Sequence, residues 1–155
     1  MQNRIEKIDH VGIVVRDLDE AIRLYTRLFC VGPASVADVP EQKVRTAFFR
    51  AGESNIELLC PTSDDSPIAK FLERRGGGIH HICVCVANIE ATLADLASQG
   101  VRLIDETPRV GAHGERIAFV HPKSFAGVLI ELSESSQDPT CAPHPHVPHK
   151  GPGSP

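Results

Sequence analysis

The segment "IDHVGIVVRDLDEAIRLY" at residues 8–25 decides the fold, because the same pattern returns as "IHHICVCVANIEATLADL" at residues 79–96. The offset is a constant 71 residues, and it places His10 over His81. Each segment starts with the dense apolar run of a strand and continues with the apolar spacing of an amphipathic helix. A repeat of this kind predicts two copies of one structural unit in a single chain.

The similarity returns further along each half. "TAFFRAGESNIELLC" at 46–60 resembles "IAFVHPKSFAGVLIELS" at 117–133, which places Glu57 over Glu131. Each half is therefore predicted to form a strand, a helix and three further strands. The expected strands are 7–15, 34–39, 43–51 and 54–60 in the first half, and 79–86, 101–105, 115–121 and 126–133 in the second.

The domain organisation follows from the repeat. We expect one α+β domain at 5–133, built from module 1 (5–62), a linker helix (63–77) and module 2 (78–133). A module this small cannot bury both faces of its sheet alone, so the two should pack into one curved mixed sheet. Residues 134–155 are rich in Pro and Ser and lack periodicity, which predicts a disordered tail.

Composition narrows the function classes. The chain has 155 residues and a formal net charge of −4, and its basic residues are dispersed, which argues against a nucleic-acid partner. No apolar run approaches the ~20 residues of a membrane span, and no secretory signal precedes the first expected strand. The five cysteines include no CxxC pair and are typical of reduced thiols. These features predict a cytoplasmic protein, or a mitochondrial matrix protein from which a leader has been removed.

Four strand residues stand out as candidate metal ligands. Strand alternation puts His10 and His81 on the face opposite the apolar residues that the helices should cover. Glu57 and Glu131 each lie between branched aliphatic residues, where an unpaired carboxylate is rare. Any one of the four alone is better explained as an ordinary strand or edge residue. The set, paired by the repeat, predicts a divalent transition-metal site with open coordination positions.

The remaining histidines carry less information. His80 faces away from His81 by strand alternation, so we interpret it as structural. His113 lies in a glycine-bounded loop and either lines a pocket or is solvated. His121 is interpreted as part of a turn.

The chain resembles the vicinal oxygen chelate superfamily, which has the glyoxalase and dioxygenase fold, and within it the methylmalonyl-CoA epimerase family. The most specific segments are "VPEQKVRTAFF", "DSPIAKFLERRGGGIHHI" and "GVRLIDETPRVGAHG", and the resemblance covers nearly all of 5–133. It implies an acid/base pair of Glu41 and Glu131. It also implies a set of four metal ligands: His10, Glu57, His81 and Glu131. Some relatives have Gln at position 57, and a second Glu makes the bound ion a weaker Lewis acid.

The resemblance implies an isomerase that interconverts (2R)- and (2S)-methylmalonyl-CoA through a metal-stabilised enolate, with removal and return of the C2 proton. We expect a divalent ion, cobalt first, with manganese, nickel, zinc or magnesium as alternatives, and a homodimer. His113 and Lys123 are the candidates for binding the acyl-CoA, with Arg109 and Lys70 as further basic residues near the site. The alternatives are a glyoxalase-type isomerase and a non-catalytic small-molecule binding protein of the same fold. Four protein ligands argue against a dioxygenase.

Overall fold

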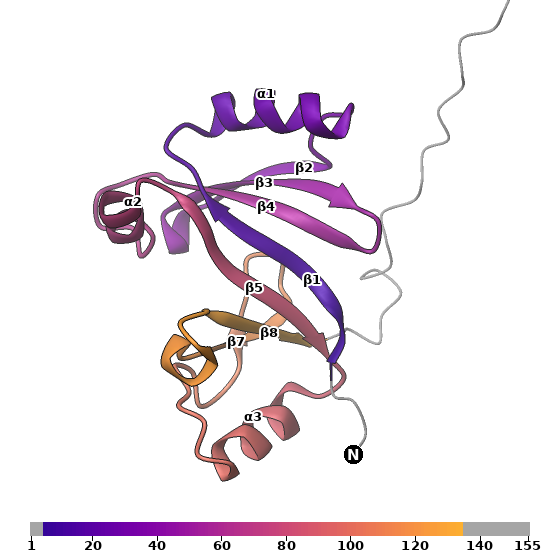
Figure 1. Cartoon of the computed structure of the whole chain (residues 1–155), viewed down its shortest axis with the longest axis vertical. Coiled ribbons are helices and arrows are strands. Elements are labelled where there is room, and N and C mark those ends of the chain that lie inside the picture. Colours follow the sequence, from indigo (N-terminus) through magenta and orange to yellow (C-terminus); the bar gives the residue numbers. More distant parts are fainter. Residues whose placement is uncertain (1–4, 135–155) are drawn as a thin grey trace, which may run out of the picture.

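A computed structural model describes residues 5–134 of the chain. One eight-stranded mixed sheet with the order β2-β3-β4-β1-β5-β8-β7-β6 forms its centre (Figure 1). The strands are β1 (Ile5–Val14), β2 (Ser35–Val39), β3 (Val44–Ala51), β4 (Ser54–Pro61), β5 (Gly78–Val86), β6 (Arg109–Val110), β7 (Arg116–Val120) and β8 (Ile130–Glu134). The helices are α1 (Leu18–Phe29), α2 (Ala69–Arg75) and α3 (Ile89–Ser98), and the 3-10 turns are η1 (Pro40–Gln42) and η2 (Pro122–Phe125).

The strand order displays the predicted repeat. β1 and β5 lie antiparallel at the centre, β1 runs parallel to β4, and β5 runs parallel to β8. The succession β1-α1-β2-β3-β4 is therefore matched by β5-α3-β6-β7-β8, and the predicted curved mixed sheet of two βαβββ units is confirmed. The division into 5–62, 63–77 and 78–133 stays a prediction. The predicted tail lies outside the described residues, apart from Glu134 at the end of β8.

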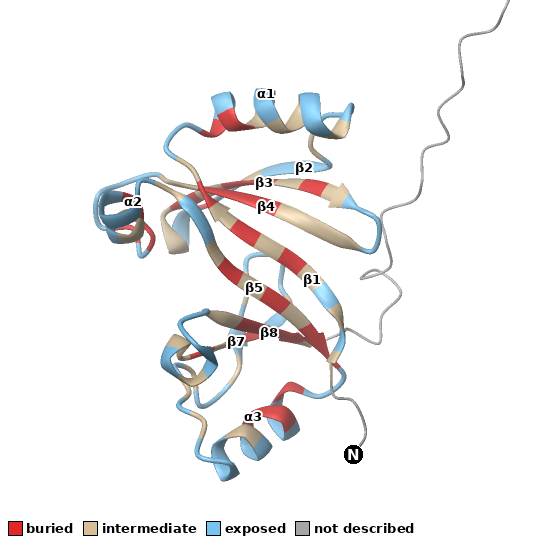
Figure 2. Ribbon diagram, in the orientation of Figure 1, coloured by how far each residue is buried: buried red, intermediate tan, exposed pale blue. Residues whose placement is uncertain are grey.

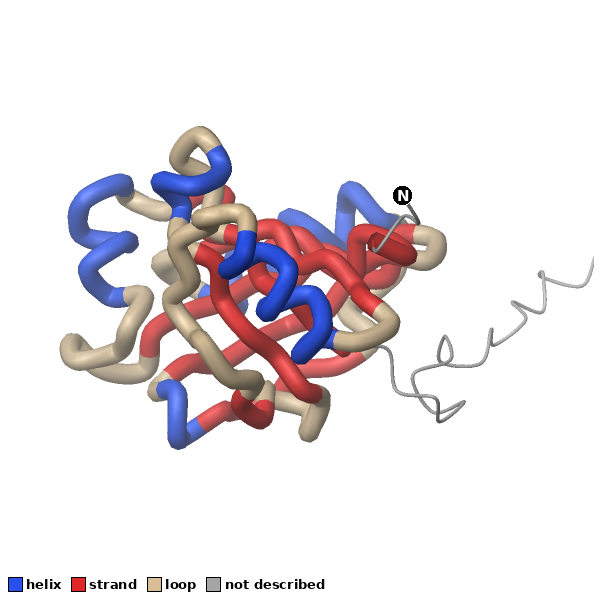
Figure 3. Tube along the Cα trace, turned by 90° about the horizontal axis from the view of Figure 1, so that it is seen from below, coloured by secondary structure: helices blue, strands red, loops and turns tan. Residues whose placement is uncertain are grey.

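The helices cover the outer face of the sheet, as the apolar pattern predicts. Ile13 and Val15 pack in the cluster beneath α1, and Val84 and Val86 pack in the cluster beneath α3. Figure 1 shows α1 and α3 at opposite ends of the molecule, and Figure 3 shows the linker helix α2 apart from both. The buried residues of Figure 2 follow the central strands. The side chains of the two central histidines are consequently left to the inner, concave face.

Each long helix begins directly after a residue whose side chain caps its first turn. The side chain of Asp17 accepts a hydrogen bond from the backbone N–H of Glu20, and that of Asn88 accepts one from Ala91. These N-caps satisfy backbone donors that the first turn of a helix leaves unpaired. None of the described helices is long and apolar enough to cross a membrane.

The predicted strand at 101–105 is wrong. Within the part of the chain that the structure describes, this segment forms only an isolated bridge between Leu103 and Val120, and β6 comes later. The Asp105 carboxylate accepts a 2.8 Å hydrogen bond from the backbone N–H of Phe119, and the Asp105 N–H also bonds the Phe119 carbonyl. An aspartate side chain that takes a backbone donor replaces a ladder bond and ends the strand.

Candidate metal centre

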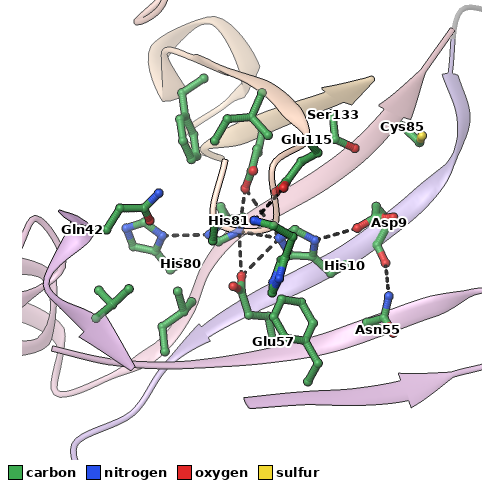
Figure 4. A pocket seen from close by; sticks show the side chains of 18 of the residues that line it. Asp9, His10, Gln42, Asn55, Glu57, His80, His81, Cys85, Glu115 and Ser133 are labelled. Atoms are coloured by element: carbon green, nitrogen blue, oxygen red, sulfur yellow. Dashed lines mark hydrogen bonds and ion pairs between the residues drawn. The ribbon is translucent and has the colours of Figure 1, made fainter. Parts of the chain in front are cut away.

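Four adjacent strands each contribute one buried polar side chain to a single point on the concave face. The four residues are His10 on β1, Glu57 on β4, His81 on β5 and Glu131 on β8, each at most 7% exposed. In the register of the sheet, Gly12 pairs with Glu57 and Cys83 pairs with Glu131. The structure thus brings together all four residues that the sequence singles out as candidate metal ligands. Figure 4 labels three of them, His10, Glu57 and His81.

The two imidazoles face each other through their Nε2 atoms, which lie 3.0 Å apart. Oε2 of Glu57 lies 3.2 Å from Nε2 of His10 and 3.5 Å from Nε2 of His81. Oε2 of Glu131 lies 3.0 Å from His81 and 3.5 Å from His10. Each nitrogen is therefore close to both carboxylates, and the arrangement has the approximate two-fold symmetry of the repeat.

This geometry fits one divalent ion. Ligand atoms bound to one ion at about 2.1 Å lie roughly 3.0 to 3.4 Å from one another, which matches the measured separations. His10, His81 and Glu131 each place one ligand atom within 4.8 Å of the others, and Glu57, which is not in this group, lies within 3.5 Å of both rings. Two neutral imidazoles and two carboxylates form a donor set that suits a transition ion and balances its charge of +2.

Mutual hydrogen bonding sets the charges in the centre. Burial favours the protonated form of Glu57, but hydrogen bonds from His10 and His81 outweigh it and lower its pKa to about 2. The pKa of Glu131 is lowered against the same burial by the same two rings. The raised carboxylate pKa that would suit a general acid is therefore absent at Glu131, and its side chain is ionised at neutral pH.

Protons and a metal ion would compete for the two imidazoles. Their Nε2 atoms lie 3.0 Å apart, and each is close to both carboxylates. Burial opposes charge on both rings, yet the hydrogen bond that Asp9 accepts from His10, and those that both glutamates accept from each ring, raise both pKa values. A metal ligand must present a lone pair, so the ion competes with a proton for each ring.

We therefore expect a divalent ion to release at least one proton per chain when it binds at pH 7. Its affinity should fall about tenfold for each pH unit of acidification per proton released. Calorimetric titration with cobalt in buffers of different ionisation enthalpy counts the protons. Binding without proton release would contradict this arrangement of the two rings.

The interpretation of His80 as a residue that faces away from the site is wrong. Its Nδ1 lies 3.0 Å from Nδ1 of His81, and its side chain lines the same cavity. The register between β1 and β5 shifts here, because Gly12 pairs with His81 while Ile13 pairs with Ile79. A bulge of this kind breaks strand alternation and re-aims a side chain. Burial and the charge of His81 lower the pKa of His80 to about 4, so this imidazole is neutral.

A cavity of about 1270 Å³ opens over the centre, and two aromatic rings form its walls. Phe48 of β3 packs edge-on against His10 with ring centroids 5.9 Å apart. Phe119 of β7 does the same against His81 at 6.1 Å. Each phenylalanine pairs in the ladder with the glutamate of its own half, so the walls also follow the repeat. They shield the centre from water on two sides.

β6 and the loop that follows it supply polar groups to the lining of this cavity. His113 stacks edge-on against Phe48 at 5.0 Å, and the guanidinium of Arg109 lies 5.1 Å above the ring of Phe119. Both residues line the cavity, as the sequence suggested for a substrate contact. Lys123 is exposed on η2 and Lys70 is exposed on α2, and neither lines the cavity.

Glu41, the second residue of the expected acid/base pair, lies on η1 with its side chain exposed. Its neighbour Gln42 lines the cavity, whereas Glu41 does not. The structure therefore places Glu41 next to the mouth of the cavity and Glu131 at its floor. The sequence did not point to Phe48, Phe119 or Gln42, because an aromatic or amide residue in a strand or turn has no distinctive signature.

The sequence model of the Glyoxalase/Bleomycin resistance protein/Dioxygenase superfamily matches residues 9–119. This range contains three of the four residues of the centre, all of β5, and β1 from Asp9 onward. The chain is a member of that superfamily.

Comparison with individual relatives identifies one family within this superfamily. The chain is 43% identical over 131 residues to the mitochondrial methylmalonyl-CoA epimerase of Dictyostelium discoideum, a match that covers 84% of this chain and 79% of that protein. The crystal structure of methylmalonyl-CoA epimerase from Mycobacterium tuberculosis matches with a TM-score of 0.82 and 38% identity, over 92% of this chain and 96% of that one. A methylmalonyl-CoA epimerase in complex with methylmalonyl-CoA and NH4+ matches with a TM-score of 0.78 and 37% identity, over 86% and 96%. The chain belongs to the methylmalonyl-CoA epimerase family.

Proposed function

We propose that the protein is a metal-dependent epimerase that interconverts (2R)- and (2S)-methylmalonyl-CoA. The observation that carries the proposal is the convergence of two histidines and two glutamates beneath a cavity, in a chain of this family. A structural relative binds methylmalonyl-CoA itself. The ligand set would be His10, Glu57, His81 and Glu131.

The reaction removes the proton on C2 of the acyl group and returns one to the opposite face. A divalent ion in the centre would supply Lewis acidity towards the thioester and carboxylate oxygens, which stabilises the developing enolate. Glu131 is ionised and buried at the floor of the cavity, so its carboxylate can accept the C2 proton of a substrate held above it. The walls formed by Phe48 and Phe119 exclude water while the enolate exists.

We assign Glu41 to the second face of C2. Its position on η1, one residue from the cavity-lining Gln42, supports this role. His113 and Arg109 at the rim are suited to contact the acyl-CoA, and Lys123 is assigned to its phosphates at the surface. We further propose cobalt as the ion, a homodimer as the assembly, and the cytoplasm or the mitochondrial matrix as the location.

The test is proton exchange at C2. (2R)-methylmalonyl-CoA is incubated in deuterated water with the chelated protein, and again after cobalt is added back. Metal-dependent deuterium uptake at C2 with appearance of the (2S) form is the expected result. Absence of exchange with every divalent ion would overturn the proposal. Turnover of a glyoxalase substrate, or binding without turnover, would then identify one of the two alternatives.

A further inference from the structure

The two central strands carry matching irregularities next to the metal centre. In the ladder between β1 and β5, Ile8 pairs with Val84 and His10 pairs with Cys83, so Asp9 is passed over. On β5 the residue passed over is His80. Each bulge thus lies immediately before a histidine of the centre, and the 71-residue offset of the repeat superposes one on the other. Bulges beside active sites commonly re-aim a side chain, and here each aims its residue at the following ring.

The two re-aimed residues contact the two histidines at equivalent atoms. Oδ2 of Asp9 lies 2.9 Å from Nδ1 of His10, and Nδ1 of His80 lies 3.0 Å from Nδ1 of His81. The Nε2 atoms of both rings face the centre. A neutral imidazole that offers its Nε2 lone pair to an ion carries its proton on Nδ1, which must be donated to a partner.

This requirement fixes the tautomer of His80. With an ion on Nε2 of His81, Nδ1 of His81 would donate, so Nδ1 of His80 would accept with its lone pair and the proton of His80 would reside on Nε2. His80 is itself held by the linker helix, because Phe71 packs edge-on against its ring at 4.9 Å, and Arg75 lies 5.6 Å from the ring of Phe71. α2 therefore has a structural connection to the centre that passes through one imidazole.

We propose that His80 is a positioning residue that orients the ring of His81 and holds its Nδ1 proton, as Asp9 does for His10. The inference rests on the proposed function in that it assumes a metal ion in the centre. The two halves differ in charge at this point. Asp9 adds an anion to the two glutamates, whereas an accepting imidazole adds none. His80 thus supports a ligand without lowering the Lewis acidity of the ion further.

The test compares His80→Leu with His80→Asn. Leu removes the acceptor, whereas the side-chain oxygen of Asn can occupy nearly the same place as Nδ1 and accept the bond. Cobalt affinity, measured by competition with a chelator, should fall about 10- to 100-fold in the Leu variant and recover to within a few-fold of the parent in the Asn variant. The visible absorption spectrum of the cobalt protein should change with Leu and return with Asn. His121→Leu, at a histidine outside the cavity lining, is the matched control and should change neither.

The readouts need no substrate, so they separate this inference from the proposed function. Parent-like affinity and spectrum in His80→Leu would overturn it, and so would a His80→Asn variant as weak as His80→Leu. Tight cobalt binding without C2 exchange would overturn the epimerase proposal alone. A parent protein that binds no divalent ion would overturn both.

Discussion

Replacing Glu131 with Gln should lower the rate of epimerisation about a thousandfold while cobalt remains bound. The amide keeps the shape of the side chain and one oxygen donor, but it cannot accept a proton. General-base catalysis contributes about 10² to 10⁴ in rate, and Glu131 is the one ionised carboxylate that we assign to both the metal and C2. The measurement is kcat at saturating cobalt, together with the rate of C2 deuterium exchange.

Glu57→Gln is the matched control for this prediction. Glu57 occupies the equivalent position of the first half, is equally buried, and lies at equivalent distances from the two imidazoles. We assign no proton transfer to Glu57. The family resemblance also implies that some relatives have Gln at this position. Its rate should stay within about tenfold of the parent. Equal losses in the two variants would show that Glu131 acts as a metal ligand only.

A third variant, Glu41→Gln, tests the role of Glu41. If Glu41 serves the second face of C2, then Glu41→Gln should abolish inversion while one enantiomer still exchanges its C2 proton through Glu131. Glu41 is exposed on η1, and the measurement is deuterium exchange at C2 of each enantiomer separately.

The sequence predicts the centre well for a physical reason. A buried charged residue needs a partner, so His10, Glu57, His81 and Glu131 appear as exceptions within apolar strands, and the repeat pairs them. The helices are equally predictable, because their N-caps and apolar stripes are local signals. Local signals of this kind do not depend on contacts with distant parts of the chain.

The predictions from sequence fail where a contact between distant segments changes the alternation of side chains along a strand. Strand alternation predicts the wrong face for His80, because the bulge depends on the pairing of β1 with β5, two strands that are far apart in the sequence. The expected strand at 101–105 does not form, because the carboxylate of Asp105 accepts a hydrogen bond from the backbone N–H of Phe119, 14 residues away. The alignment of the repeat places Asp9 and His80 in the same position, which is the one sequence signal that relates them.

Gly12→Ala should damage the metal centre although Gly12 offers no ligand. Gly12 pairs with His81 across the central ladder, and a Cβ at this position would lie 2.1 Å from Cε1, 2.4 Å from Nδ1 and 2.7 Å from Nε2 of the His81 ring. No carbon atom fits at these separations, so the ring must move away from the point where the four side chains meet. A misplacement of about 1 Å costs roughly 100-fold in rate. Cobalt affinity and kcat should both fall by at least that factor.

The cause can be isolated with a control and a double-mutant cycle. Gly32→Ala is the control, because nothing lies within 4 Å of a Cβ at that position, and it should leave both quantities unchanged. In the chelated protein, Gly12→Ala should lower the free energy of unfolding when His81 is present. In a His81→Ala background, where the ring is gone, the same substitution should cost almost nothing. A penalty that persists in that background would place the effect in the strand itself and would contradict the view that Gly12 is required because the ring of His81 occupies the space beside it.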